Sequence, residues 1–199
     1  MSQLSGAPAA QPARGRPSTG ARERILEACL EVLKAEGYAG LSIAKVAAKA
    51  GENKALISYH FGSKQGLVTA AGRELGQSIS DEILGGLEGA DSVEDVVRGA
   101  AEGMWALMAR DERLARVYFD LSAVSVVESD VREVMREVKA AWRRTLAELL
   151  GQGEDSPAVV LVIAGLEGLS LEWIERGDTQ GLREARELFV AGAVSALGE

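Results

Sequence analysis

The sequence predicts an all-α protein of about nine helices, with a small amino-terminal helix-turn-helix domain and a larger helical domain behind it. Apolar residues make up 47% of the 199 residues and charged residues 26%, with only four Pro. Ala, Leu, Glu and Arg, all good helix formers, are frequent. Apolar side chains recur at helical spacing through most of the chain after residue 20. We therefore divide the chain into residues 1–20, 21–64 and 65–199.

The chain begins with a segment that lacks the pattern of a folded element. Residues 1–20 contain three Pro and almost no large apolar side chain, so we expect a disordered tail. The first helix is predicted over residues 21–36, because one apolar stripe runs along it and Gly37 ends it. The stripe, whose Cys29 is expected to be a core residue, consists of Ile25, Ala28, Cys29, Val32 and Leu33.

Residues 41–64 contain two short helices around a tight turn. Ser42 can cap a helix over residues 43–50, and Gly51 can take the left-handed conformation at its end. Asn53 can cap a second helix over residues 54–61. Two helices joined by a three- to four-residue turn that contains Gly form a helix-turn-helix.

The outer side of the second short helix carries groups that bind nucleic acid. Donors to phosphates and base edges gather there, at Lys54, Ser58, Tyr59 and His60, with Lys64 just beyond the helix. The amino-terminal part of the chain is also basic and the remainder acidic. Residues 1–64 hold nine Lys or Arg against five Asp or Glu, and residues 65–199 hold thirteen against twenty-five. A basic domain on an acidic body suits a DNA-binding protein in spite of the net charge of −8. Arg14 and Arg16 of the tail either only solubilise it or form an arm in the minor groove.

Residues 44–67 read AKVAAKAGENKALISYHFGSKQGL. This stretch resembles the DNA-binding signature of the TetR family of bacterial transcriptional regulators, whose usual form is close to IAxxAGVSKGxLYxHFxSKExL. The resemblance covers about residues 22 to 70, and the matching residues are Val46, Ala47, Ala50, Gly51, Lys54, Ile57, His60, Phe61, Ser63, Lys64 and Leu67. It implies a cytosolic homodimer that binds a near-palindromic operator in double-stranded DNA and responds to a small-molecule effector.

On this resemblance the DNA contacts fall into two groups. Contacts to the phosphate backbone are expected from Ser42, Lys54, Tyr59, His60 and Lys64, and contacts to base edges from Ala55, Leu56 and Ser58. One departure from the family pattern is Glu52, which stands where Val is usual. Its charge repels phosphate unless Lys45 or Lys49 neutralises it. The departures at Ala44, Ala55, Leu56 and Ser58 leave the operator sequence open.

Six further helices are predicted in residues 65–199, which the resemblance identifies as a ligand-binding and dimerisation domain. Ser63 can cap the first, which links the two domains, and Ser92 and Ser156 can cap two others. Their expected spans are about 64–84, 92–110, 111–127, 130–150, 157–176 and 179–197.

The helix over residues 157–176 is apolar on every side in its first half, AVVLVIAGL. A helix of this kind is buried on every side, which in a body of this size requires a second subunit. Gly165 and Gly168 would let a partner helix approach closely. On the resemblance, this helix and the last one form a four-helix dimer interface that includes Val162, Gly165, Leu188 and Phe189.

Enzymatic chemistry finds little support in the sequence. The chain has one His and one Cys, too few for a Ser-His-Asp arrangement outside the helix-turn-helix or for the usual zinc ligand sets. No phosphate-binding glycine motif is present. We expect no catalytic residue, cofactor or metal site. We also expect no membrane contact, because no continuous apolar run reaches about 20 residues.

Large adaptable side chains recur on three successive body helices, at Trp105, Met108, Tyr118, Phe119, Met135 and Trp142. They are either ordinary core or the lining of a cavity for an apolar or amphipathic effector. Glu167 is the unusual residue of its helix, because burying an unpaired carboxylate is costly. It pairs with an Arg, for which Arg143 and Arg144 are candidates, or faces the dimer rim, or meets a ligand, which leaves room for a cationic one.

The sequence thus favours a TetR-like regulator, a repressor that a small ligand releases from its operator. A ligand-independent helical DNA-binding architectural protein and a small helical enzyme are the alternatives. A ligand-dependent change in DNA affinity would separate the regulator from the first alternative.

Overall fold

The part of the chain described by the computed structural model, residues 20–87 and 89–197, forms eight α-helices and no strand. They are α1 (Ala21–Gly40), α2 (Ile43–Ala50), α3 (Lys54–Phe61), α4 (Lys64–Gly85), α5 (Val93–Val124), α6 (Ser129–Leu150), α7 (Pro157–Arg176) and α8 (Gln180–Leu197). The all-α prediction is confirmed. Except for Gly20, the predicted tail, with Arg14 and Arg16, lies outside the described residues.

Short polar side chains just before the first residue cap six of these helices, where backbone N–H groups lack helical partners. The Oγ of Ser42 accepts from the Lys45 N–H at 3.3 Å, and the Oδ1 of Asn53 accepts from the Leu56 N–H at 2.8 Å. Ser63, Ser92 and Ser156 cap α4, α5 and α7 in the same way. These five caps are those expected from the sequence. The sixth is at α8, where the Oγ1 of Thr179 accepts from the Leu182 N–H at 3.2 Å.

The two helices predicted over residues 92–110 and 111–127 meet at a kink at their predicted boundary. One helix, α5, covers both, with a single non-helical residue at Asp111, whose φ is −154° and ψ 79°. The expected break is therefore a kink of one residue. Asp111 accepts from the Arg113 backbone N–H at 3.3 Å and from the Arg113 Nε at 2.8 Å, and these bonds hold the kinked turn together.

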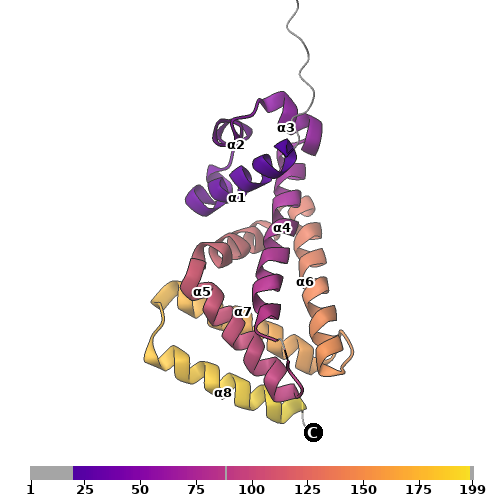
Figure 1. The fold of residues 1–199 in the computed structure, drawn as a ribbon, viewed down its shortest axis with the longest axis vertical. Coiled ribbons are helices and arrows are strands. Elements are labelled where there is room, and N and C mark those ends of the chain that lie inside the picture. The colour runs from indigo at the N-terminus through magenta and orange to yellow at the C-terminus, as the bar shows by residue number, and fades with distance from the viewer. Residues whose placement is uncertain (1–19, 88, 198–199) are drawn as a thin grey trace, which may run out of the picture.

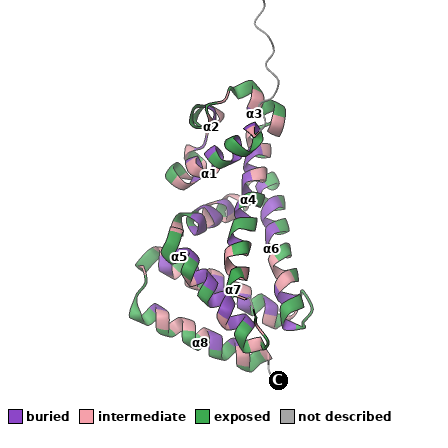
Figure 2. Cartoon of the chain, viewed as in Figure 1, coloured by how far each residue is buried: buried purple, intermediate pink, exposed green. Residues whose placement is uncertain are grey.

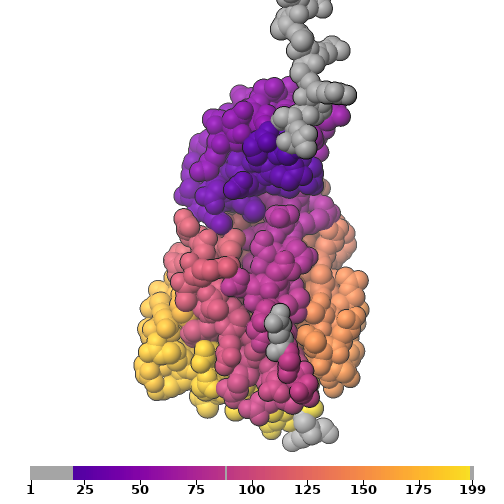
Figure 3. Space-filling view, in the orientation of Figure 1, coloured from indigo at the N-terminus to yellow at the C-terminus, as the bar shows by residue number. Residues whose placement is uncertain are grey.

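The first three helices form a separate unit at one end of the molecule (Figures 1 and 3). Its core comes from α1, whose predicted stripe is buried, and from Val46, Ala47 and Ile57. Gly51 ends α2 with φ 66°, the left-handed conformation that Gly tolerates. The α1 helix is interrupted at Gly37, where φ is 68°, as the sequence predicted. We call this unit, α1 to α3, the head.

The remaining helices form the body, and α4 runs from the head down into it (Figure 1). α4 lies very close to α6, because Gly72 and Gly76 face α6. A Cβ at Gly76 would lie 2.7 Å from both Cγ atoms of Val138, closer than such atoms can approach. Figure 2 shows buried residues along the inner sides of α4, α5 and α6. The core is thus continuous from the head through α4 into the body.

The apolar side chains of α7 lie in two different environments. Val159, Val162, Leu166 and Trp173 are buried, while Val160 is 49%, Leu161 48% and Leu171 44% exposed. It is also the one helix in the described ranges that is long and apolar enough to cross a membrane by length and composition, with mean hydropathy 1.6 and 28% of that window buried. It is not a continuous apolar run, because Glu167 and Glu172 interrupt it.

Candidate DNA-binding surface and ligand cavity

The outer side of α3 presents four of the predicted DNA contacts together. The four side chains that are exposed are Lys54, Ala55, Ser58 and Tyr59. The last three follow Lys54 by one, four and five positions, which places all four on one face of a helix. Tyr59 is 73% exposed although it is aromatic. α3 lies at the end of the molecule away from the body (Figure 1). The structure therefore gathers these four exposed side chains on one surface at that end of the molecule.

Two other predicted contacts on α3 lie partly inward. Leu56 is half-buried and packs against the head core. His60 is half-buried between Tyr59 and Phe61, with ring centroids at 5.2 and 6.1 Å. Its Nε2 is buried and, within the described residues, has no hydrogen-bond partner. A helix of eight residues cannot turn six neighbouring side chains outward, so these two residues contribute to packing.

Two predicted phosphate contacts lie at helix starts beside α3. The Ser42 hydroxyl accepts a capping bond, which leaves its own proton free to be donated. Lys64 is half-buried, and its Nζ lies 4.7 Å from the centroid of the Tyr38 ring. The first turns of α2, α3 and α4 contain no acidic residue, so the N–H groups there can meet phosphate without repulsion.

The charge of Glu52 is compensated, but by neither of the two predicted lysines. Arg24 of α1 contacts Glu52 with Nη2 to Oε1 at 2.5 Å, and the Glu52 side chain is only 14% exposed. Lys45 instead contacts Glu36 and donates to the Gly40 carbonyl at 2.9 Å. The sequence could not indicate Arg24, because the partner is 28 residues away and is brought near only by the packing of α1 on the turn.

The head and the body also meet through α5. The backbone N–H of Tyr38, at the end of α1, donates to Asp120 Oδ2 at 2.5 Å, and Lys34 of α1 contacts Asp111 at 3.2 Å. Burial raises the pKa of the Tyr38 phenol, with a further contribution from the nearby Glu128 carboxylate. Tyr38 therefore touches Lys64 with its ring and Asp120 with its backbone. These contacts between the head and the body were not predicted from the sequence.

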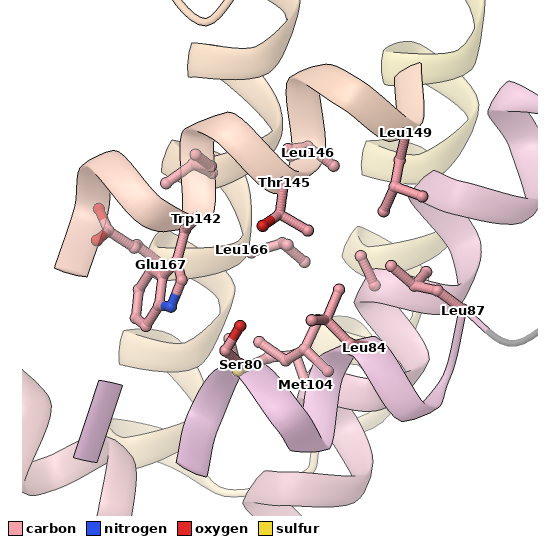
Figure 4. A pocket seen from close by; sticks show the side chains of 13 residues that line it. Ser80, Leu84, Leu87, Met104, Trp142, Thr145, Leu146, Leu149, Leu166 and Glu167 are labelled. Atoms are coloured by element: carbon pink, nitrogen blue, oxygen red, sulfur yellow. The ribbon is translucent and has the colours of Figure 1, made fainter. Parts of the chain in front are cut away.

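A cavity of about 70 Å³ lies between α4, α5, α6 and α7 (Figure 4). A second cavity of about 20 Å³ shares Met104, Trp142 and Glu167 with it. Four of the seven predicted ligand-binding residues line one or both of these spaces: Tyr118, Phe119, Trp142 and Glu167. The walls that sequence reasoning missed come mainly from the inner sides of α4 and α6, at Ser80, Ile83, Leu84, Leu87, Thr145, Leu146 and Leu149.

Three predicted pocket residues lie elsewhere. Met108 and Met135 are 3% and 4% exposed and belong to the core. Trp105 faces α7 and α8, since its ring lies 5.1 Å from that of Trp173 and its Nε1 donates to Asp178 at 3.3 Å. The prediction that these three line the cavity was wrong, because a helix in the middle of a body has core on several sides.

Glu167 has partners other than the predicted arginines. Its Oε1 accepts from the Tyr118 hydroxyl and lies 2.8 Å from the Nζ of Lys139 on α6. Burial and the bond to Glu167 raise the pKa of the Tyr118 phenol, so this hydroxyl stays protonated and donates. Lys139 lies four positions before Arg143, on the next turn of the same helix. The helix was therefore predicted correctly, but not the residue.

The four predicted dimer residues divide into inner and outer ones. Val162 is fully buried within one chain. Gly165 faces Phe189 of α8 in the same chain, where a Cβ would lie 2.2 Å from its ring, so this glycine serves contact between α7 and α8 of one chain. Leu188 is 75% exposed. Val162 was predicted to lie in the dimer interface, but it is already enclosed within one chain. A helix that is apolar on all sides carries no signal of which side faces outward.

The Cys29 thiol is buried in the core of the head. Burial raises the pKa of the Cys29 thiol to about 12, so it is not a nucleophile at neutral pH. Among the described residues no group of three or more His, Cys, Asp or Glu side chains could hold a metal ion.

Comparison with known proteins relates the chain to regulators. Residues 25–71 match the family model described as bacterial regulatory proteins, tetR family. The HTH-type transcriptional regulator BetI 1 of Chromohalobacter salexigens is 25% identical over 122 residues, which cover 61% of this chain and 60% of that protein. The match thus spans less than two-thirds of that relative.

Solved structures match over most of the chain. A crystal structure assigned to a TetR-family transcriptional regulator from Rhodococcus sp. has a TM-score of 0.76 and 25% identity, covering 90% of this chain and 98% of that one. The multidrug binding protein EbrR, solved with imidazole, has a TM-score of 0.73 and 22% identity, covering 90% and 91%.

Proposed function

We propose that this chain, whose residues 25–71 match the TetR family, is a transcriptional regulator with a helix-turn-helix DNA-binding domain, and that it acts as a ligand-released repressor. In this proposal two chains form a two-fold dimer that binds a near-palindromic operator in the cytoplasm. A small apolar or amphipathic molecule enters the body and lowers the affinity for the operator. Residues 21–64 read the DNA, and residues 65–199 bind the ligand and form the dimer.

The course of α4 is the observation that carries the proposal. Its first residue, Lys64, lies beside Tyr38 of the head, and its later residues Ile83 and Leu84 line the cavity. One helix thus touches both the proposed DNA surface and the proposed ligand site. A ligand that fits only one position of this helix shifts the equilibrium between head positions by its difference in affinity for them.

The outer face of α7 and α8 supports the dimer. Val160, Leu161 and Leu171 of α7 and Leu188 of α8 are each between 44% and 75% exposed. The spacing of the three α7 residues puts them on one face of the helix, and Gly168 between them has nothing near its Cβ position. Large apolar side chains gathered on one exposed face are the usual material of a dimer interface.

The cavity favours the regulator over a ligand-independent architectural protein. Its walls are almost entirely apolar, with Ser80, Thr145 and Glu167 as polar groups near them. The space is smaller than the roughly 300–1,000 Å³ of typical ligand sites, so binding requires α4 or α6 to shift. Such a shift is what a release mechanism needs. EbrR, which shares the fold, binds imidazole, and small apolar or amphipathic molecules are the first compounds to screen.

Selection of binding sites from random double-stranded DNA tests the proposal. The full chain should enrich one near-palindromic sequence, because a two-fold protein reads matched half-sites. Sedimentation of the complex should give two chains, or a multiple of two, for each duplex. Asymmetric sites bound by a single chain would contradict the dimer, and sequence-independent binding would favour the architectural alternative.

A further inference from the structure

Glu167 is the one charged side chain that lines either cavity in the described part of the chain. It lies next to Trp142 at one side of the cavity, whose apolar walls include Leu166 and Met104 (Figure 4). Its side chain is 25% exposed. A carboxylate in such surroundings requires a cation or several hydrogen bonds to remain ionised at little cost.

Lys139 supplies that cation from the edge of the site. Its Nζ lies 2.8 Å from Glu167 Oε1 and 5.8 Å from the centroid of the Tyr118 ring. The Lys139 side chain is 34% exposed, so its ammonium can move into water while the aliphatic stem stays on the protein surface. The ammonium therefore occupies its place beside Glu167 without being enclosed there.

Aromatic rings complete the surroundings of Glu167. The Tyr118 ring centroid lies 5.1 Å from that of Trp142 and 5.3 Å from that of Phe119. All three rings and Glu167 line the same small cavity. Several aromatic faces with one carboxylate form the arrangement that binds organic cations, because the negative faces of the rings attract a diffuse positive charge.

We propose that the effector is a compact organic cation, such as a substituted ammonium with one aromatic or alkyl arm, and that its charge takes the place of the Lys139 ammonium beside Glu167. This inference rests on the proposed ligand-released repressor and names the class of its ligand. In the unliganded protein Lys139 acts as an internal substitute for the ligand. On binding, the lysine goes to water, the carboxylate keeps a cation, and the hydrophobic arm enters the space between Leu84, Met104 and Leu146.

An anion or a neutral molecule fits the same site less well. An anion would lie beside the Glu167 carboxylate, and no second cation lines either cavity in the described residues. A neutral molecule would use only the apolar walls and would leave the Glu167–Lys139 pair in place. The cation alone makes a favourable contact with both the carboxylate and the rings.

Two molecules of nearly the same shape test the inference. Phenyltrimethylammonium and tert-butylbenzene differ in one central atom and one charge, and their binding to the full chain can be followed by tryptophan fluorescence and calorimetry. The cation should bind the wild type about tenfold more tightly than the neutral molecule. Lys139→Met should tighten the cation about fivefold by removing its competitor. Glu167→Gln should weaken the cation at least tenfold.

Binding of tert-butylbenzene should change little in either variant. Arg144→Met, which removes the same charge from the exposed side of α6, is the control for a general electrostatic effect and should leave cation binding unchanged. If both molecules bind equally in the wild type and in all three variants, the inference is wrong while the ligand cavity stands. If neither molecule binds any form that still binds the selected operator, both the inference and the ligand site of the proposed function fail.

Discussion

Lys64 is a cation in the first turn of a helix, where the helix dipole disfavours positive charge. The structure accounts for this position in two ways. The Tyr38 ring lies 4.7 Å from the Lys64 Nζ, and a cation above an aromatic face is stabilised. The remaining ammonium protons can be donated to a DNA phosphate next to the free N–H groups of the turn.

Lys64→Ala should therefore weaken binding to every DNA sequence by a similar factor. Loss of one phosphate contact lowers the slope of log affinity against log salt by about 0.9 and the affinity by about fivefold near 0.1 M salt. Titrations of the selected operator and of unrelated DNA at several salt concentrations measure both. Arg136→Ala, on the body, is the control. A loss confined to the operator would assign Lys64 to sequence reading instead.

At the residue scale the sequence predicted features that depend on near neighbours. The caps at Ser42, Asn53 and Ser63 followed from the chemistry of a side-chain oxygen that accepts from the backbone N–H three residues later. The partners of Glu52 and Glu167 could not be predicted, because Arg24 and Lys139 come from distant positions on other helices. Only the packing of those helices determines which of several nearby cations is in reach.

At the scale of elements, a single turn of α5 contacts both the smaller cavity and the head. Tyr118 and Phe119 line the smaller cavity, and the next residue, Asp120, accepts the Tyr38 N–H of the head. In the proposed release mechanism, α5 is therefore a second connection between the cavity and the head, beside α4. The kink at Asp111, whose side chain contacts Lys34 of α1, separates this second half of α5 from the first.

Asp120→Ala should loosen the end of α1 without unfolding the chain. The Tyr38 N–H would lose a charged acceptor, which costs about 1–3 kcal/mol, and hydrogen exchange at that amide should become correspondingly faster. Operator affinity should fall because the head is held less firmly. Asp120→Asn keeps an acceptor oxygen and should show the smaller effect. Equal exchange in the wild type and both variants would mean that this bond does not hold the head.

The fold could be predicted at this scale because apolar spacing marks every helix. Where the prediction counted two helices over residues 92–127, the structure has one helix with a kink, and the polar run Arg110 to Arg113 resembles a loop in sequence. The inner and outer sides of α7 could not be told apart, since Val160, Leu161 and Val162 are equally apolar. Burial of only the last of these is a result of packing.

At the scale of the whole molecule, the proposed dimer predicts different effects for two similar substitutions, one on dimer dissociation and the other on folding. Leu188→Asp should raise the dimer dissociation constant by about 100-fold or more, because two charges enter an apolar interface, while each chain stays folded. Val162→Asp should unfold the chain, because Val162 is fully buried within it. Sedimentation and circular dichroism measure both effects. Val126→Asp, at an apolar site that is 74% exposed, is the control, and dissociation equal to that of Leu188→Asp would place the interface elsewhere.

The contact of Gly76 with Val138 has a consequence for the DNA itself. Gly76 lies twelve residues after Lys64 and eight before Leu84, which are about 18 and 12 Å along a helix. If this tight contact is a fixed pivot, a movement of about 1 Å at Leu84 moves Lys64 by about 1.5 Å in the opposite direction. In a two-fold dimer the distance between the two heads then changes by up to about 3 Å. Successive base pairs are about 3.4 Å apart, so a ligand that displaces Leu84 by about 1 Å puts the two heads about one base pair out of step with their half-sites.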